Sequence, residues 1–180
     1  MKKQSLHIRD LCMIGFFTAV IVIMAQIVIP MPFGVPFTMQ TFAITLASIV
    51  LGSKNGAIAS IIYVMLGAIG LPVFANFTGG WQSIIGPTGG FILSFPLMAY
   101  IIGLGMELRS KWKGFSIVML VLGTFLNLFC GALMFSIITN SPLIVGITTC
   151  IIPFILASII KAFLAYVLGF NIRRRLQAFL

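Results

Sequence analysis

A single lysine, Lys161, lies within a long apolar stretch of the sequence, residues 147–170. A charged ammonium at the centre of a bilayer costs about 2.5–3.5 kcal/mol on insertion scales. The interiors of the apolar stretches contain no acidic residue that could pair with it. Arg173 follows 12 residues later, roughly 18 Å along a helix, so the alternative of a side chain that extends to an interface requires a long reach. We expect Lys161 to face a cavity and to bind an anionic group of a ligand.

A second set of candidate binding residues lies in segment 71–90, which contains five glycines, two prolines and no charged residue. Exposed to water, its aromatic side chains would form a sticky patch, whereas folded over a cavity they can pack against a small apolar ligand. Its glycines also leave backbone N–H groups free to bind a carboxylate or carbonyl. We expect a lid with the binding residues Phe74, Asn76, Trp81 and Thr88. The alternative is a turn-rich connector with an interfacial tryptophan.

The remaining reactive residue types do not form a catalytic or metal-binding pattern. His7 is the only histidine, and Cys12, Cys130 and Cys150 are scattered without metal or disulfide spacing. The apolar stretches contain no nucleophile–base pair. The glycine-rich segment also lacks the Lys-Ser/Thr pair of a Walker A phosphate loop. We therefore expect no catalytic residue, no metal, no cofactor and no enzymatic activity.

The composition is that of an integral membrane protein. Of 180 residues, 61% are hydrophobic and 7% are charged, too few charges to solvate a soluble fold of this size. The net charge of +9 comes from basic residues beside apolar stretches, so we expect a lipid bilayer and no nucleic acid as partner. Leu11 begins an apolar stretch of span length with no A-x-A-type cleavage site after it, which favours a membrane span over a signal peptide.

Six apolar stretches are candidate membrane helices, each near the ~20 residues needed to cross a bilayer, although the second and third are shorter. They are residues 11–29, 37–53, 56–71, 90–107, 115–138 and 147–170. The proline-rich segment 30–36 cannot be a regular helix. Because there is no repeat, hydrophilic domain or linker, we expect residues 1–180 to form one all-α membrane domain. Its structured outer loops should cap a ligand cavity.

The basic residues predict the orientation of these helices. They occupy alternate segments between or beside the apolar stretches, namely Lys2, Lys3 and Arg9, then Lys54, then Arg109, Lys111 and Lys113, and finally Arg173, Arg174 and Arg175. The segments 30–36, 72–89 and 139–146 contain no lysine or arginine. By the positive-inside rule, we expect a multi-pass plasma-membrane protein with both termini in the cytoplasm and the uncharged loops outside.

Short motifs in the outer segments resemble those of a known family. The runs P-F-T-M-Q-T (residues 36–41), G-L-P-V-F (residues 70–74) and G-P-T-G-G-F (residues 86–91) are similar to the BioY family, and the similarity extends over about residues 8–172. BioY proteins are the biotin-capturing S components of energy-coupling-factor (ECF) transporters. The resemblance implies a six-helix protein that binds biotin beneath its outer loops. It implies that the protein works with a membrane scaffold subunit and two ATPase subunits, or in some cases alone.

The resemblance also assigns roles to residues. Asn76 is similar to the family's head-group-binding asparagine, and Lys161 to the lysine that ends the motif Pro-x-Asp-x-x-Lys. Ser158 stands at the position of the aspartate, and three residues apart on a helix it shares a face with Lys161. We expect biotin, with Gln40, Asn76 and Ser158 binding its polar head. Because a serine is a weaker acceptor than a carboxylate for the ureido N–H groups, lipoate or another valerate-tailed vitamin is the alternative.

A pair of small residues predicts a helix contact. Gly15 and Ala19 are four residues apart in the first apolar stretch, a spacing that lets another helix approach closely. The sequence alone allows either a contact within this protein or a contact with a partner, and the resemblance favours the scaffold subunit. An ion-coupled secondary transporter is a rival function, but such folds tend to have internal repeats and more intramembrane ionisable residues.

Overall fold

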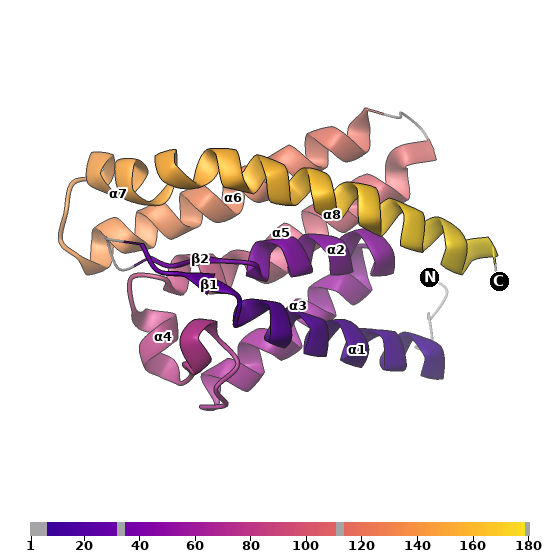
Figure 1. The fold of residues 1–180 in the computed structure, drawn as a ribbon, viewed down its shortest axis with the longest axis horizontal. Coiled ribbons are helices and arrows are strands. Elements are labelled where there is room, and N and C mark those ends of the chain that lie inside the picture. Colours follow the sequence, from indigo (N-terminus) through magenta and orange to yellow (C-terminus); the bar gives the residue numbers. More distant parts are fainter. Residues whose placement is uncertain (1–6, 32–34, 111–113, 179–180) are drawn as a thin grey trace, which may run out of the picture.

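The structure is a computed structural model that describes residues 7–31, 35–110 and 114–178. Its α-helices are α1 (Ile8–Ala25), α2 (Gln40–Leu51), α3 (Ser53–Ala68), α4 (Trp81–Ile85), α5 (Gly89–Glu107), α6 (Phe115–Ile138), α7 (Leu143–Cys150) and α8 (Ile152–Ala178). Two short 3₁₀ helices, η1 (Ala75–Phe77) and η2 (Leu108–Ser110), and two strands, β1 (Val28–Ile29) and β2 (Phe37–Thr38), complete the described elements. The long helices form a bundle in which α1 begins and α8 ends at the same end (Figure 1).

The helix lengths agree with a membrane protein. Within the described residues, α1, α5, α6 and α8 are long and apolar enough to cross a bilayer. Helix α2 has 12 residues and α3 has 16, so at ~1.5 Å per residue they are shorter than the ~30 Å hydrocarbon core. The all-α membrane fold is confirmed, whereas the count of six spans stays a prediction. Lys2, Lys3, Lys111, Lys113 and part of the proline-rich segment lie outside the described residues.

Several boundaries of the predicted spans were wrong. The end of the first predicted span and the start of the second pair as a short antiparallel hairpin, in which Val28 lies opposite Thr38 and Ile29 opposite Phe37. The proline that follows Ile29 disfavours helical backbone at that residue, which agrees with its extended conformation in β1. The predicted span 147–170 is divided between α7 and α8, because Pro153 has no N–H to continue the hydrogen-bond ladder of α7.

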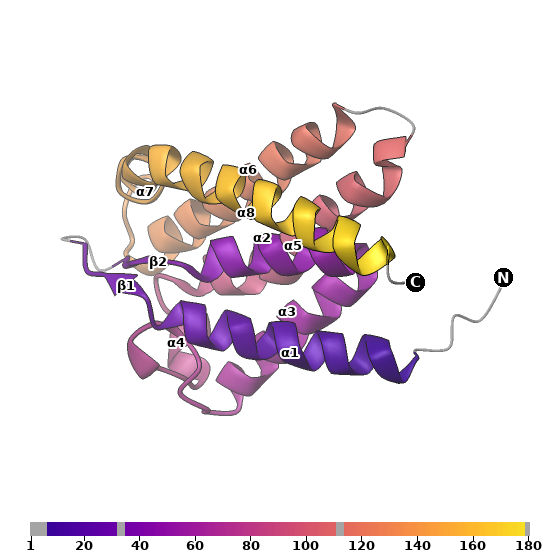
Figure 2. The same ribbon diagram turned by 45° about the vertical axis from the view of Figure 1, so that its right-hand side comes forward.

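Helix α2 lies at the centre of the bundle, between α1, α5 and α8 (Figure 2). Ten of its 12 residues are buried, including Ala43 and Ala47, whose small side chains allow neighbouring helices to approach closely. In contrast, large apolar side chains such as Phe16, Phe125 and Leu156 are exposed on α1, α6 and α8. An apolar outer surface of this kind is stable in lipid and would aggregate in water.

Polar contacts join four helices at the end of the bundle where the chain begins and ends. The carboxylate of Glu107, the last residue of α5, accepts hydrogen bonds from the Ser53 N–H (2.7 Å) and the Ser53 hydroxyl (2.9 Å) at the start of α3. Arg173 of α8 donates to the Ile49 carbonyl of α2 at 2.7 Å. The starts of α2, α5 and α8 therefore lie at the other end, where two loops gather, one with the β1–β2 hairpin and the other formed by residues 69–88.

Candidate substrate-binding site

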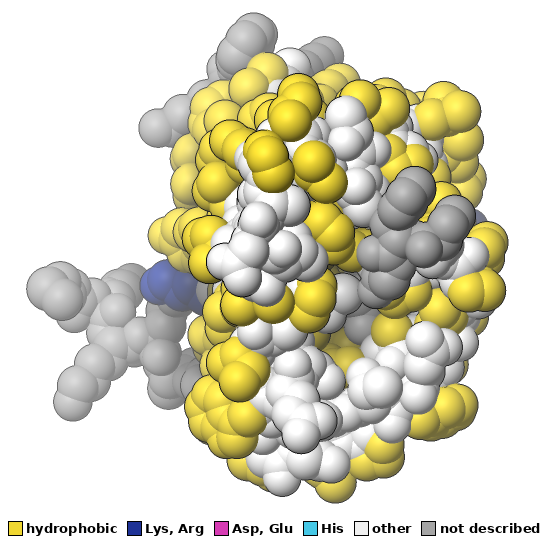
Figure 3. All heavy atoms as spheres, turned by 90° about the vertical axis from the view of Figure 1, so that its left-hand side faces the viewer, with side chains coloured by type: hydrophobic (Ala, Val, Ile, Leu, Met, Phe, Trp, Pro, Cys, Tyr) yellow, Lys and Arg dark blue, Asp and Glu magenta, His cyan; other side chains and the backbone are white. Residues whose placement is uncertain are grey.

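A cavity of about 290 Å³ lies at this end of the bundle. Figure 3 shows this end of the molecule, hollowed between apolar and neutral polar groups. The lining comes from both of these loops and from α2, α5, α6 and α8, and comprises Val35, Pro36, Thr38, Gln40, Thr41, Phe74, Ala75, Asn76, Thr78, Ser83, Thr88, Phe91, Ile92, Phe95, Asn127, Leu128, Phe154, Ser158 and Lys161. The volume is near the lower end of the range for small-molecule sites, about 300–1,000 Å³.

Lys161 is 7% exposed and lines this cavity, as the sequence predicts. It is not without protein partners, however, because its Nζ donates to the Thr38 carbonyl at 3.0 Å and lies 4.2 Å from the centroid of the Phe37 ring. Both partners are neutral, so they stabilise the ammonium without cancelling its charge. Lys161 is the only charged residue in the described lining. The cavity therefore offers an anion a single positive group.

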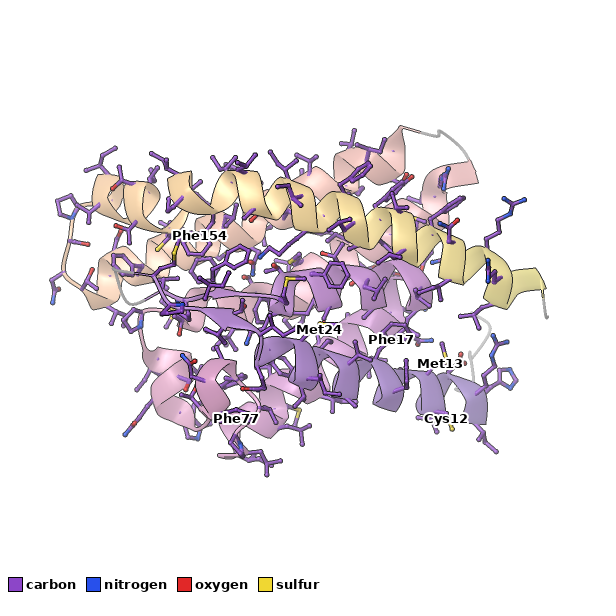
Figure 4. All side chains as sticks on the ribbon, viewed as in Figure 1. Cys12, Met13, Phe17, Met24, Phe77 and Phe154 are labelled. Atoms are coloured by element: carbon purple, nitrogen blue, oxygen red, sulfur yellow. The ribbon has the colours of Figure 1, made fainter. Side chains whose placement is uncertain are left out.

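The first of these loops contacts one face of α8 through strand β2. Phe37 of β2 stacks on Phe154, with their ring centroids 6.1 Å apart, and Phe154 lies beside the hairpin in Figure 4. Phe154 and Lys161 are seven residues apart on α8, two helical turns, so both reach the same strand. Ser158, one turn from Lys161, also lines the cavity, which agrees with the predicted shared face.

Gln40 begins α2 with its amide already hydrogen-bonded. Its Nε2 donates to the hydroxyl of the fully buried Tyr63 at 2.8 Å, and its Oε1 accepts from the Thr38 hydroxyl at 3.2 Å. These bonds fix the amide orientation at the cavity wall. Its neighbour Thr41 is different, because its buried Oγ1 has no hydrogen-bond partner among the described residues, although Thr41 lines the cavity.

Asn127 of α6 is a cavity residue that the sequence analysis missed. It is 1% exposed, and its Nδ2 donates to the Phe91 carbonyl at 2.9 Å and the Ser94 hydroxyl at 2.8 Å. Both amide hydrogens are thus used, which leaves the Oδ1 as an acceptor for a ligand donor. The signal that could have found it is its amide, the only one in the apolar stretch 115–138, just as Lys161 is the only charge in its stretch.

The second loop, residues 69–88, reaches the cavity through a tight turn. Phe74 is buried, and its ring packs edge-on against Tyr63 with centroids 5.5 Å apart. A side chain at Gly67 would overlap this ring, so the glycine makes room for it. Asn76 follows in the left-handed region, with φ 57°, at the exposed edge of the cavity. Thr88, which directly precedes α5, also lines the cavity.

The structure does not place Trp81 in the cavity. Its side chain is 68% exposed and is not part of the lining. Trp81 is the first residue of the short helix α4, and its ring points away from the protein. This agrees with the alternative interpretation from the sequence, in which the tryptophan lies at the membrane interface. The aromatic wall of the cavity is instead built by Phe74 and by residues that the sequence analysis did not select, namely Phe91, Phe95 and Phe154.

The predicted partner-binding pair lies on the outer surface of α1. Gly15 and Ala19 are both exposed, and a Cβ atom added at Gly15 would have no atom within 4 Å. Within the described residues, the absence of a side chain at Gly15 is therefore not needed for a close contact with another helix of this chain. The face is open to an external helix or to lipid.

Comparisons with known proteins agree on one family. The BioY family model matches residues 1–178. The chain is 36% identical over 164 residues to a probable biotin transporter BioY of Pyrococcus horikoshii, covering 89% of this chain and 94% of that protein. It is 32% identical over 175 residues to biotin transporter BioY2 of Lactococcus lactis, covering 97% and 95%. A biotin transporter BioY of Thermotoga maritima is 51% identical over 104 residues, which cover 58% of this chain and 61% of that protein.

A solved structure shows the same architecture. It is described as the S-component for biotin from an ECF-type ABC transporter, and it superposes with a TM-score of 0.84 at 31% sequence identity. The match covers 93% of this chain and 92% of that one. Because the family model spans nearly the whole chain and relatives above 30% identity match it from end to end, this chain belongs to the BioY family.

Proposed function

We propose that this protein captures biotin on the outer face of the plasma membrane and delivers it across the membrane as the S component of an ECF importer. Its membership of a transporter family makes it a membrane transport protein and not an enzyme. The observation that carries the substrate proposal is the cavity in which Lys161 is the one charged group of the described lining, among neutral polar side chains and phenylalanines. Biotin combines one carboxylate, an apolar body and a neutral ureido head, and each has a matching group in this lining.

In the proposed complex, Lys161 binds the carboxylate. An ammonium has three N–H donors, and the Thr38 carbonyl uses one of them, so two remain for the ligand. Asn76, Ser158 and the Oδ1 of Asn127 would bind the ureido head, while Gln40 helps to fix its orientation. Phe74, Thr88 and the other phenylalanines would pack around the apolar body. The second outer loop would act as the lid.

The proposed topology has six membrane helices, with α2 and α3 as short spans and both termini in the cytoplasm. Its support is the charge distribution, because Lys54, Arg109 and Arg173 lie near the contacts that join the chain-end side of the bundle. The cavity lies at the other end, which carries no basic residue in the segments 72–89 and 139–146. By the positive-inside rule, that end faces outward.

The proposed partners are an ECF scaffold subunit and its two ATPase subunits. The exposed Gly15–Ala19 face of α1 is where a scaffold helix could approach closely. Transport by the chain alone is the other arrangement that the family resemblance implies. The rival of an ion-coupled secondary transporter has less support, because Lys161 is the single ionisable residue among those that the structure describes in the cavity lining.

A second substrate is favoured by one observation, the serine at position 158. Without a carboxylate in the described lining, the cavity lacks a charged acceptor for ureido N–H groups. Lipoate has the same valerate tail and an apolar dithiolane head, which needs no such acceptor. The rest of the lining still offers neutral acceptors for a ureido head, so biotin remains the first proposal.

Calorimetric titration of the purified protein with biotin and with lipoate tests the proposal directly. We expect saturable, one-to-one binding of biotin, with lipoate weaker but measurable. Desthiobiotin, which retains the ureido ring and the carboxylate, serves as a control for head-group recognition. Binding of neither vitamin would overturn the proposed function, whereas tighter binding of lipoate would replace biotin as the substrate.

A further inference from the structure

Gln26, the residue that follows α1, joins this helix to the second outer loop. Its Nε2 lies 3.1 Å from the Phe74 carbonyl and 3.3 Å from the Val73 carbonyl, while its Oε1 accepts a hydrogen bond from the Phe77 N–H at 2.9 Å. The partners are 47 to 51 residues away in the sequence. One amide therefore binds the loop backbone both before and after Asn76, as a neighbouring strand would.

The backbone that Gln26 contacts is in an unusual conformation. Asn76 and Phe77 both have positive φ angles, 57° and 54°. A left-handed residue other than glycine costs roughly 1–2 kcal/mol, less for asparagine than for phenylalanine. Such backbone persists only where surrounding contacts hold it. The turn also closes on itself, since the Phe74 N–H donates to the Thr78 carbonyl at 2.9 Å.

Few other contacts hold this turn from outside. The Phe74 ring fits against Gly67, but this packing anchors the residue before the turn and not Asn76 or Phe77. Phe77 itself is exposed at the edge of the loop (Figure 4). Among the hydrogen bonds of the described residues, Gln26 supplies the only side-chain bonds that reach from another helix to residues 74–78.

We infer that Gln26 is a positioning residue for ligand recognition. It holds residues 74–78 in the left-handed turn that places Asn76 at the cavity, so that the turn is ordered before the ligand arrives. Preorganisation of this kind raises affinity, because the ligand does not have to order the loop on binding. The inference rests on the proposed function in one respect, the contact of Asn76 with the ligand head.

The test uses the full chain and the substitution Gln26→Met, which keeps the length of the side chain and removes its donors and acceptor. We expect biotin affinity to fall about tenfold, since two to three hydrogen bonds of ordinary strength are lost. In an Asn76→Ala background, the same substitution should change the affinity less than about twofold, because the group that Gln26 positions is already gone. If the fold-losses of biotin affinity from the two single substitutions multiply in the double variant, as independent effects do, the inference is overturned.

A second measurement needs no ligand. Hydrogen–deuterium exchange of residues 74–78 in the empty protein should be faster in Gln26→Met, and intermediate in Gln26→Glu, which keeps an acceptor for the Phe77 N–H. Thr18→Val is the matched control, because it removes side-chain bonds of α1 to the Ile14 and Ala59 carbonyls without touching the loop. It should leave this exchange unchanged.

The two measurements separate two failures. If the wild-type protein bound no biotin, the proposed function would fail, while faster exchange in Gln26→Met would still support the role of Gln26 in ordering the turn. If exchange in residues 74–78 were the same in the wild type and in Gln26→Met, the positioning role would be refuted, whatever the ligand.

Discussion

Replacement of Lys161 tests the chemistry of the cavity most directly. Lys161→Met keeps the length of the side chain and removes its charge and donors. The bond to Thr38 at 3.0 Å and the contact with Phe37 lie within the protein, so their loss lowers the stability of the protein and does not itself measure binding. What binding loses is the charge pair between the ammonium and the ligand carboxylate.

The size of this loss follows from burial. Lys161 is 7% exposed, so a carboxylate beside it is largely desolvated. Removing one partner of a buried, hydrogen-bonded charge pair costs about 2–5 kcal/mol, which is about 30-fold to several thousand-fold in the dissociation constant. Lys161→Arg should retain little of the wild-type biotin affinity, because the planar guanidinium does not match the position of the compact ammonium.

The assay is a comparison of two ligands by calorimetric titration. Biotin should bind Lys161→Met far more weakly than the wild type, whereas biotinamide, which has no carboxylate, should bind both proteins with similar affinity. Arg173→Gln is the matched control on the same helix, because Arg173 bonds to the Ile49 carbonyl at the other end of the bundle. It should leave biotin affinity unchanged. Equal losses for biotin and biotinamide would refute a specific role of Lys161 in binding the carboxylate.

Three further predictions concern orientation, assembly and selectivity. In a background without native cysteines, a cysteine at Thr78 should react with an impermeant thiol reagent from outside, and one at Ser110 should not; the opposite labelling would reverse the orientation. Ala19→Trp should abolish co-purification of the scaffold subunit and leave biotin binding intact, whereas loss of binding would place Ala19 in an internal contact. Ser158→Asp should raise biotin affinity and lower lipoate affinity, and an unchanged ratio in competition binding would remove the main support for lipoate.

The sequence predicted the fold class and much of the cavity because the physical signals are strong. A buried lysine is costly enough that Lys161 stands out from its apolar neighbours. The resemblance to the family motif selected Ser158, and helical spacing places it on the same face as Lys161. The glycine-rich run at 86–90 marks an irregular segment beside the cavity. The break at Ile151 was also readable, since the proline two residues later removes a helix donor. It was missed because the apolar run continues through it.

Other features could not be read from local pattern. The hairpin strands have two residues each, too short for alternation to appear. Gln26 is an ordinary glutamine at a helix end, and its role depends on a loop about 50 residues away. Trp81 was selected for its size and its place in the glycine-rich segment. Its outward direction is set by the start of α4, which composition does not reveal.

The neutral surroundings of Lys161 bear on how the empty and loaded states differ. A carbonyl and a ring of the protein stabilise the buried ammonium, and no counter-charge lies in the described lining. With an aspartate in place of Ser158, the ammonium would have an anionic partner one turn away before any ligand arrived. In this chain, the ligand carboxylate itself completes the pair. Without added ligand, Ser158→Asp should therefore melt at a higher temperature than the wild type, because its buried ammonium already has a counter-charge. An unchanged or lower melting temperature of the variant would contradict this account.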